Sequence, residues 1–575
     1  MNFFDISSDQ GIPGSSGSRS RFTPLPLSFD TVNENRTLSV SSQSSNLFRL
    51  PVELLTLIAQ LLPSSSLAAF ALLNRDCRQL ARSRQFARVR FDYSMRSLDL
   101  LRILVQEAFD RAQNNGLTES PALGACIRYV KVTIRGEHVA ARHGVSLDSN
   151  FIDRDKQERE RMLIEANDSY YRTYIPFVRI AIAKALPNLQ FLEWTDDITV
   201  SRSFFSNLTK SPVQHLQLVV KVNEEFELDT KALQPNGGWL LRTLYLDLRS
   251  FDPPAEPVST SSIFYSVLRA CAPTLQDLTW TRHLMVSPSG PKDEVLSSLI
   301  SDTYFPKLRR LKFSGLSSSD FSLFDKTLKS EEGCKIHILE IDRDRYLTKY
   351  GLLASLDTLI WHWTDPQVKL EFDFLESNPQ LTRLSSSWPQ HPKNVMRVVS
   401  ILSRSFSHLR SLRLTWDGTS IPRDALRLIG TITSLEQICL GAGITVGWRH
   451  SFLIDHGAIR HNLASLRNLR KIAFHRDTYD AEDPDHYYEE PLTHRMYPIY
   501  DDFIANWERN HKDMIVAEAK KYMQIFPELK WLYIGQLPMQ INRYATESLT
   551  VLSERDDSYT LLDEVYDNTE KFFVS

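Results

Sequence analysis

The chain has 575 residues, of which 42% are hydrophobic and 10% aromatic, so most of it carries enough apolar surface to fold. Its formal net charge of -3 gives no electrostatic attraction to nucleic acid or to an anionic membrane. No apolar run approaches the roughly 18 residues of a membrane span, and the five cysteines are too scattered for a disulfide framework or a CxxC metal site. With no signal peptide at the N-terminus, these features predict an intracellular protein of the cytoplasm or nucleus that binds neither nucleic acid nor membranes.

Residues 1–46 are rich in serine, with glycine, proline and asparagine between the serines. The runs Ser15-Ser16-Gly17-Ser18 and Ser41-Ser42-Gln43-Ser44-Ser45 are typical of flexible segments that cannot bury a core. This composition predicts a disordered leader.

Residues 47–92 are apolar for so short a segment, and about 45 residues cannot bury a sizeable core alone. A helical stripe begins behind Pro51 and ends before Pro63, and it comprises Leu54, Leu55, Ile58, Leu61 and Leu62. A second stripe follows, with a break at Asn74-Arg75, and it comprises Leu67, Phe70, Leu73, Cys77 and Leu80. The leucines of this segment therefore need another surface to cover them.

The segment resembles the F-box. The resemblance is carried by Leu50-Pro51-x-Glu53-Leu54, Ile58, Leu61-Leu62-Pro63, Leu67 and Asn74-Arg75-Asp76-Cys77-Arg78. The family often has a tryptophan shortly after the last of these stretches, and here Phe86 stands in that region instead. The resemblance implies three helices that bind a Skp-type adaptor, and through it a cullin. The residues expected to contact the adaptor are Leu50, Pro51, Glu53, Leu54, Ile58, Leu61, Leu62, Leu67 and Phe70.

A run of arginines closes this segment, and it comprises Arg75, Arg78, Arg82, Arg84, Arg88 and Arg90. A nucleic-acid patch is one interpretation, but a solvated or partner-facing side of the third helix fits the negative net charge better. We expect residues 93–180 to form a helical linker or cap.

From residue 181 to 541 a short phrase recurs, in which leucine, two residues, an apolar residue, one residue and a further apolar residue follow one another. Its first leucines are Leu189, Leu241, Leu275, Leu308, Leu356, Leu381, Leu409, Leu435, Leu469 and Leu529, with weaker copies at 213–218 and 336–341. Most starts lie roughly 25–34 residues apart, the scale of a leucine-rich repeat with one strand and one helical return. The sequence therefore predicts an α/β fold, an N-terminal three-helix F-box followed by a leucine-rich-repeat-like solenoid of short parallel strands and helices. We expect the solenoid to be irregular, because the Asn or Cys that usually follows the phrase is absent.

Residues 442–526 interrupt this rhythm, and we interpret them as an insertion. It contains an acidic, tyrosine-rich loop at 479–490 and a predicted helix at about 500–526; a tail follows at 542–575. Its region holds His450, His456, His461, His475, His486, His494 and His511, whose spacings match no zinc motif and indicate surface or loop histidines. No motif for catalysis, a metal or a cofactor is found in the chain.

The function implied is that of the substrate receptor of an SCF-type ubiquitin ligase, a non-catalytic subunit whose repeats bind an unknown protein. The outward strand positions are the candidate substrate contacts, and they are Thr243, Tyr245, Asp277, Thr279, Arg310, Lys312, Arg413, Lys471, Trp531 and Tyr533. One alternative is a repeat scaffold for protein interactions that takes no part in ubiquitination. Another is an enzyme within the 442–526 insertion.

Overall fold

A computed structural model gives the fold. It describes residues 27–116, 120–133, 169–198, 207–221, 239–250, 267–284, 303–314, 321–329, 334–341, 349–361, 372–386, 389–418, 420–442, 454–475, 501–535, 537–543 and 548–551, with a few single residues between these ranges. The chain divides into two compact units, Met1–Leu308 and Arg309–Ser575. Each is described by itself.

Three helices form at residues 52–85 of the first unit, as predicted. They are α3 (Val52–Leu61), α4 (Ser64–Ala71) and α5 (Arg75–Gln85). Pro51 precedes α3 and Pro63 separates α3 from α4, because proline lacks the N–H that a helix interior needs but is tolerated at a helix start. Asn74 caps α5, since its side-chain oxygen accepts a hydrogen bond from the backbone N–H of Cys77 at 2.8 Å.

The segment before these helices is folded from residue 27 onward. It contains α1 (Phe29–Val32), α2 (Val40–Gln43) and the 3-10 helix η1 (Asn46–Arg49). Phe29 and Val32 are buried in one cluster with Leu55 and Ala59 of α3 and Leu80 of α5. The prediction of a disordered leader is therefore wrong for residues 27–46, whose apolar side chains complete a core that the three helices cannot close alone. Residues 1–26 lie outside the described part of the chain.

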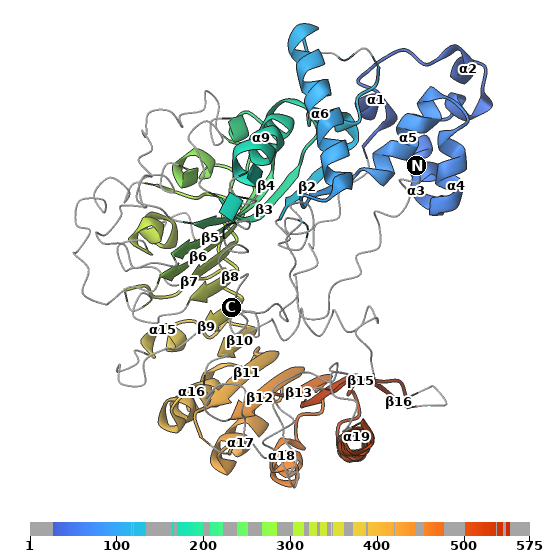
Figure 1. The fold of residues 1–575 in the computed structure, drawn as a ribbon. Helices are drawn as coiled ribbons and strands as arrows, with labels where there is room; N and C mark the ends of the chain where they lie inside the picture. Colours follow the sequence, from blue (N-terminus) through green and yellow to red (C-terminus); the bar gives the residue numbers. More distant parts are fainter. Residues whose placement is uncertain are drawn as a thin grey trace. The chain divides into compact units, whose positions relative to one another are not determined.

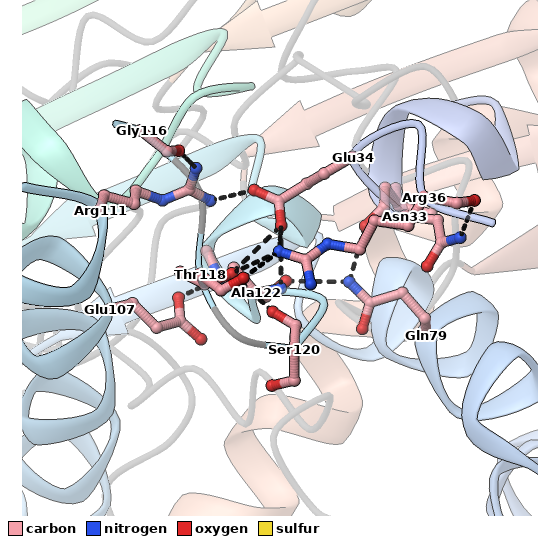
Figure 2. A network of polar contacts seen from close by, with 12 residues as sticks. Asn33, Glu34, Arg36, Gln79, Glu107, Arg111, Gly116, Thr118, Ser120 and Ala122 are labelled. Carbon is pink, nitrogen blue, oxygen red and sulfur yellow. Dashed lines mark hydrogen bonds and ion pairs between the residues drawn. The ribbon is translucent and has the colours of Figure 1, made fainter. Parts of the chain in front are cut away.

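A polar network fastens this segment to the helix that follows the three-helix region, α6 (Met95–Gln113) (Figure 2). The carboxylate of Glu34 forms ion pairs with Arg36 and with Arg111 of α6. It also accepts hydrogen bonds from the hydroxyl of Thr118 and the backbone N–H of Ala122, both at 3.3 Å. Because the Glu34 side chain is only 9% exposed, these donors and cations compensate the loss of its hydration.

Gln79 of α5 joins the same region from the other side (Figure 2). Its side-chain amide donates to the backbone carbonyls of Val32 at 2.7 Å and Ala122 at 2.9 Å, and it is 1% exposed. One buried amide thus satisfies carbonyls of the leader and of the first repeats at once.

The strands of the first unit pair in chain order, each parallel to the next. They are β1 (Arg88–Phe91), β2 (Tyr129–Val132), β3 (Phe191–Ile198), β4 (His215–Lys221), β5 (Thr243–Ser250) and β6 (Asp277–Leu284) (Figure 1). Besides α6, the helical segments include η2 (Gly124–Cys126), η4 (Tyr170–Tyr174) and α9 (Ile175–Lys184). The region 93–180 is therefore not wholly helical, because β2 lies within it, and the parallel strands begin at Arg88 rather than at residue 181.

The second unit continues the alternation of strands and helices. Its strands are β7 (Arg310–Ser314), β8 (Ile338–Ile341), β9 (Thr358–Trp361), β10 (Arg383–Ser386), β11 (Ser411–Trp416), β12 (Gln437–Ala442), β13 (Lys471–His475), β14 (Trp531–Gly535), β15 (Leu537–Ile541) and β16 (Leu549–Val551). Strands β7–β14 are parallel, and β15 and β16 are antiparallel additions. Its helical segments are η6 (Ser322–Phe324), α14 (Asp325–Leu328), α15 (Asp373–Glu376), α16 (Pro392–Ser405), α17 (Arg423–Gly430), α18 (His456–Leu463) and α19 (Asp501–Ile525). Helices α16, α17 and α18 lie next to one another on one side of β11–β13 (Figure 1).

Every copy of the recurring phrase lies at a strand, which confirms the repeat interpretation. The leucine that opens the phrase is buried before the strand, and the two later apolar residues are buried on the strand, as with Leu409, Leu412 and Leu414. Alternation of this kind is expected because neighbouring strand residues point to opposite faces.

Polar side chains replace the missing asparagine ladder at another position, the residue just before the opening leucine. Thr274 donates to the carbonyl of Leu241 at 2.8 Å, Ser434 to that of Leu409 at 2.7 Å, and Asn188 to that of Ala125 at 2.7 Å. Each bond joins one repeat to the preceding one. In these three repeats a carbonyl of the preceding repeat is thereby satisfied by three different residue types.

The interval 442–526 is less of an insertion than predicted, because α18, β13 and α19 continue the strand-and-helix pattern inside it. Helix α19 agrees with the helix expected at 500–526. Strand β16 lies in the expected tail. The acidic loop at 479–490, the histidines at 450, 486 and 494, and residues 552–575 lie outside the described residues. His456 is buried rather than at the surface; its Nδ1 lies 2.8 Å from the hydroxyl of Tyr522.

Candidate functional site

Helix α3 presents an apolar face to solvent. Leu54, Leu57 and Leu61 are 44%, 48% and 84% exposed, and their spacing of three and four residues places them on one side of the helix. Leu50 and Pro51, just before the helix, are also exposed. Large apolar side chains gathered on one helix face are typical of a surface that another protein covers. We call Leu50, Leu54, Leu57 and Leu61 the docking face.

The opposite side of α3 is used inside the protein. Leu55 and Ala59 are buried in the cluster that holds Phe29, Val32, Leu80 and Cys126. Arg84 of α5 donates to the carbonyl of Ala59 at 3.1 Å and to that of Leu62 at the end of α3. The inner side of α3 is thus packed against the protein core, and the leucine side chains of the docking face remain exposed to solvent.

The nine residues expected to contact an adaptor are distributed over both sides of these helices. Glu53 is exposed alongside Leu50, Pro51, Leu54 and Leu61, whereas Ile58, Leu62 and Phe70 are half-buried. Phe70 packs against the internal cluster. Leu67 is 3% exposed, because α4 turns this residue toward the interior, and its contact with an adaptor stays a prediction.

Within the described F-box segment, three exposed leucines were not among the predicted contacts: Leu57, Leu72 and Leu73. Leu57 lies three residues after Leu54 and four before Leu61, so separating the two faces of the helical stripe would have identified it. Leu72 and Leu73 follow α4 in the turn before Asn74. Leu73 belongs to the second apolar stripe of the sequence, but it is exposed because the helix ends at Ala71.

The arginine run does not form one surface. Arg75, Arg78 and Arg88 are exposed, in agreement with a solvated side of the helix. Arg84, though exposed, donates to backbone carbonyls of α3 as described above, and Arg88 lies over the ring of Tyr129 at 5.7 Å from its centroid.

The first residues of β2, β3 and β4 are in register, and their side-chain rings stack on one another. Tyr129 and Phe191 stack at 4.8 Å between centroids, and Phe191 and His215 at 5.9 Å. Nδ1 of His215 lies 3.0 Å from the hydroxyl of Thr243. Burial, and then the positive charge of Arg242, lowers the pKa of His215. The predicted contact Thr243 is therefore part of an internal ladder.

The predicted contacts of this unit lie on two neighbouring strands, β5 and β6. Register places Thr243 opposite Asp277, and Tyr245 opposite Thr279. Thr243, Tyr245 and Asp277 are half-buried, but Thr279 is 8% exposed and offers little surface to a partner.

In the second unit the predicted contacts are spread over four strands. Arg310 and Lys312 lie on β7, Arg413 on β11, Lys471 on β13, and Trp531 and Tyr533 on β14. Lys471 and Trp531 are opposite one another in register. Lys312 forms a 2.5 Å ion pair with Glu340 of β8. Arg413 is 8% exposed and offers little surface to a partner, so its contact with a substrate stays a prediction.

The cysteines are all free and buried. Burial raises the pKa of Cys77 to about 11 and that of Cys126 to about 12, so neither is a reactive thiolate near neutral pH. Among the described residues, no group of three or more His, Cys, Asp or Glu side chains is placed to hold a metal ion. No helix in the same residues has the length and apolar character to cross a membrane.

Comparison with known proteins supports the assignment of the F-box part. Residues 47–88 match the F-box domain, and the match ends where β1 begins. No curated protein sequence matches the chain. Among solved structures, a leucine-rich-repeat protein of Leptospira interrogans is similar, with 14% identity over 52% of this chain and 74% of that chain, at a TM-score of 0.24. The match to residues 47–88 confirms the F-box resemblance. The chain's own elements show the fold, a helical F-box region followed by leucine-rich-repeat-like parallel strands alternating with helices.

Proposed function

We propose that this chain is the substrate-recognition subunit of an SCF-type ubiquitin ligase. In this proposal the F-box binds a Skp-type adaptor, which links the chain to a cullin, and the repeats bind a protein substrate. The observation that carries the proposal is the docking face, an exposed row of leucines on an F-box helix whose other side is committed to the internal core.

The docking face is large enough for a specific interface. Burying a leucine side chain stabilises by about 1.5–3 kcal/mol, so Leu54, Leu57 and Leu61 together offset a substantial part of the cost of association. Amphipathic helices that place such anchors in a groove are a recurrent mode of protein recognition.

The chemical contribution of the chain would be proximity. The chain makes and breaks no bond itself; it raises the effective concentration of the substrate near a ubiquitin-loaded enzyme. Five buried, unpaired cysteines agree with work in a reducing intracellular compartment.

The test is binding of the purified full chain to a recombinant Skp-type adaptor, by pull-down and by calorimetry. The double variant Leu54→Asp with Leu57→Asp should bind roughly 100-fold more weakly, because two anchors are lost and two charges are introduced. A matched control is Ile103→Asp with Phe109→Asp on α6, where the side chains are 44% and 53% exposed; this variant should bind normally. Equal binding by the docking-face variant, with its circular dichroism unchanged, would remove the proposal. If the unaltered chain bound no adaptor, a repeat scaffold outside ubiquitination would be the better interpretation.

A further inference from the structure

The strand starts of β10–β14, in the second unit, carry an excess of positive charge. The first residues of these strands are in register, and they are Arg383, Ser411, Gln437, Lys471 and Trp531. The residues just before them are joined in series by backbone N–H to carbonyl hydrogen bonds, and they are Thr382, Arg410, Glu436, Arg470 and Lys530. We call these ten residues the basic edge.

The basic edge contains five cationic side chains and one carboxylate. Glu436 lies 3.8 Å from Arg410 and 3.3 Å from Arg470, so its charge is shared by two arginines. Within the described part of the chain, Arg383, Lys471 and Lys530 have no ion-pair partner. The edge ends at β9, where Asp357 accepts a 2.5 Å hydrogen bond from the hydroxyl of Thr382.

The cations of the edge also affect one another. Burial, and then the charge of Arg383, lowers the pKa of Lys471. Like charges on one edge without a counter-ion are unfavourable in the free protein, and an anion placed between them relieves that cost. The basic edge should therefore attract a negatively charged ligand.

The dimensions of the edge suit an extended chain. Adjacent strands lie about 4.8 Å apart, so β10 and β14 are separated by roughly 19 Å, the length of about six residues in extended conformation. Ser411 and Gln437 lie between the cations, with the Gln437 amide donating to the Ser411 hydroxyl at 2.5 Å. The half-buried Trp531 gives one end an aromatic side chain.

We propose that the basic edge binds an acidic segment of a protein, held extended across β10–β14 with its carboxylates facing Arg383, Lys471 and Lys530. The proposal rests on the function proposed above, for which it names the class of substrate. A nucleic acid is the poorer occupant, because single-stranded binding combines a continuous cationic groove with several stacking rings. Here Glu436 interrupts the cations and Trp531 alone among the ten residues is aromatic.

The test is fluorescence anisotropy with the full chain and a labelled twelve-residue peptide of alternating glutamate and serine. Binding should be measurable at 50 mM salt, fall when salt is raised to 300 mM, and be absent for a peptide of alternating glutamine and serine. The variant Arg383→Gln with Lys471→Gln should raise the Kd about fivefold, the effect expected for two exposed charge contacts. The matched control Arg423→Gln with Arg427→Gln removes the same charge from exposed sites on α17 and should leave the Kd unchanged.

Three results would overturn the proposal: no binding of the acidic peptide, equal weakening by the α17 variant, or tighter binding of a twelve-nucleotide single-stranded RNA. Adaptor capture measured on the same preparations keeps the two proposals apart. Capture without peptide binding overturns the basic edge alone. Peptide binding without capture supports the edge and overturns the ligase assignment.

Discussion

Gly430 is the position at which the spacing of two neighbouring repeats can be tested most directly. It ends α17, and a Cβ added there would lie 2.1 Å from the backbone carbonyl oxygen of Asn462 in α18. Its own carbonyl accepts a 2.5 Å hydrogen bond from the hydroxyl of Ser465. Gly430→Ala therefore forces the two helices apart by about 1 Å, in an interior packed too densely to absorb the shift.

The expected cost follows from these contacts. Overpacking costs about 1–3 kcal/mol, weakening of the Ser465 hydrogen bond adds up to about 1 kcal/mol, and the better helix propensity of alanine offsets up to about 1 kcal/mol. A net loss of about 2 kcal/mol lowers the apparent Tm of a unit of this size by about 4–8 °C. We compare apparent Tm values rather than free energies of unfolding, since a chain of two units need not unfold in one step.

The assay is thermal unfolding followed by circular dichroism, with hydrogen exchange of α17 and α18. Gly457→Ala is the control, because Gly457 lies on α18 and its added Cβ would meet nothing closer than the carboxylate of Asp455 at 3.4 Å. The control should keep or slightly raise the Tm. An unchanged Tm and unchanged exchange in Gly430→Ala would refute the close approach of the two helices.

Two further predictions concern the first unit. Burial, and then the nearby charge of Arg242, lowers the pKa of His215 in the folded protein. The stabilisation from this group is therefore fully present above its unfolded pKa of about 6.5. It is lost as the pH falls from there through the folded pKa. The apparent Tm should fall less between pH 7.5 and 5.5 in His215→Gln than in the unaltered chain, and an equal fall in both would contradict this role. Gln79→Leu leaves two buried carbonyls without a donor, at about 2–4 kcal/mol in total, and should speed hydrogen exchange in α1 and η2. Gln106→Leu, at an exposed site on α6, should leave that exchange unchanged, and equal exchange in both variants would show that Gln79 does not fasten the leader.

Most strands were predictable because the apolar positions of the recurring phrase are mostly occupied by leucine. Strands β1 and β2 follow the same spacing with other residues, as Ile127, Val130 and Val132 do at β2, and a search for leucine passes over them. The requirement is burial at fixed spacing, which several apolar residues satisfy. A pattern read by side-chain class rather than by residue identity would have started the sheet at Arg88.

The leader and the strand face show where composition and periodicity cannot decide. Serine dominates the leader, yet a few apolar residues such as Phe29 and Val32 bury it against the core of the F-box helices, which is open at that side. On the strand face, period two correctly places Arg413 opposite the leucines of β11, but exposure depends on what covers a position, and no local pattern records that. The docking face could have been predicted from the sequence by separating the inner and outer apolar stripes of α3.

The position of Cys126 determines how the F-box is coupled to the first repeats. This residue precedes β2 and is buried in the same cluster as Leu55 and Ala59 on the inner side of α3. A helix that joined the strands through a flexible linker would let its outer face turn independently, whereas a shared core fixes that face relative to β1 and β2. An adaptor bound to Leu54 and Leu57 would therefore hold these strands in a set orientation. It follows that substitutions in the inner cluster should alter the orientation of the F-box helices relative to β1 and β2, while substitutions on the docking face should leave that orientation unchanged.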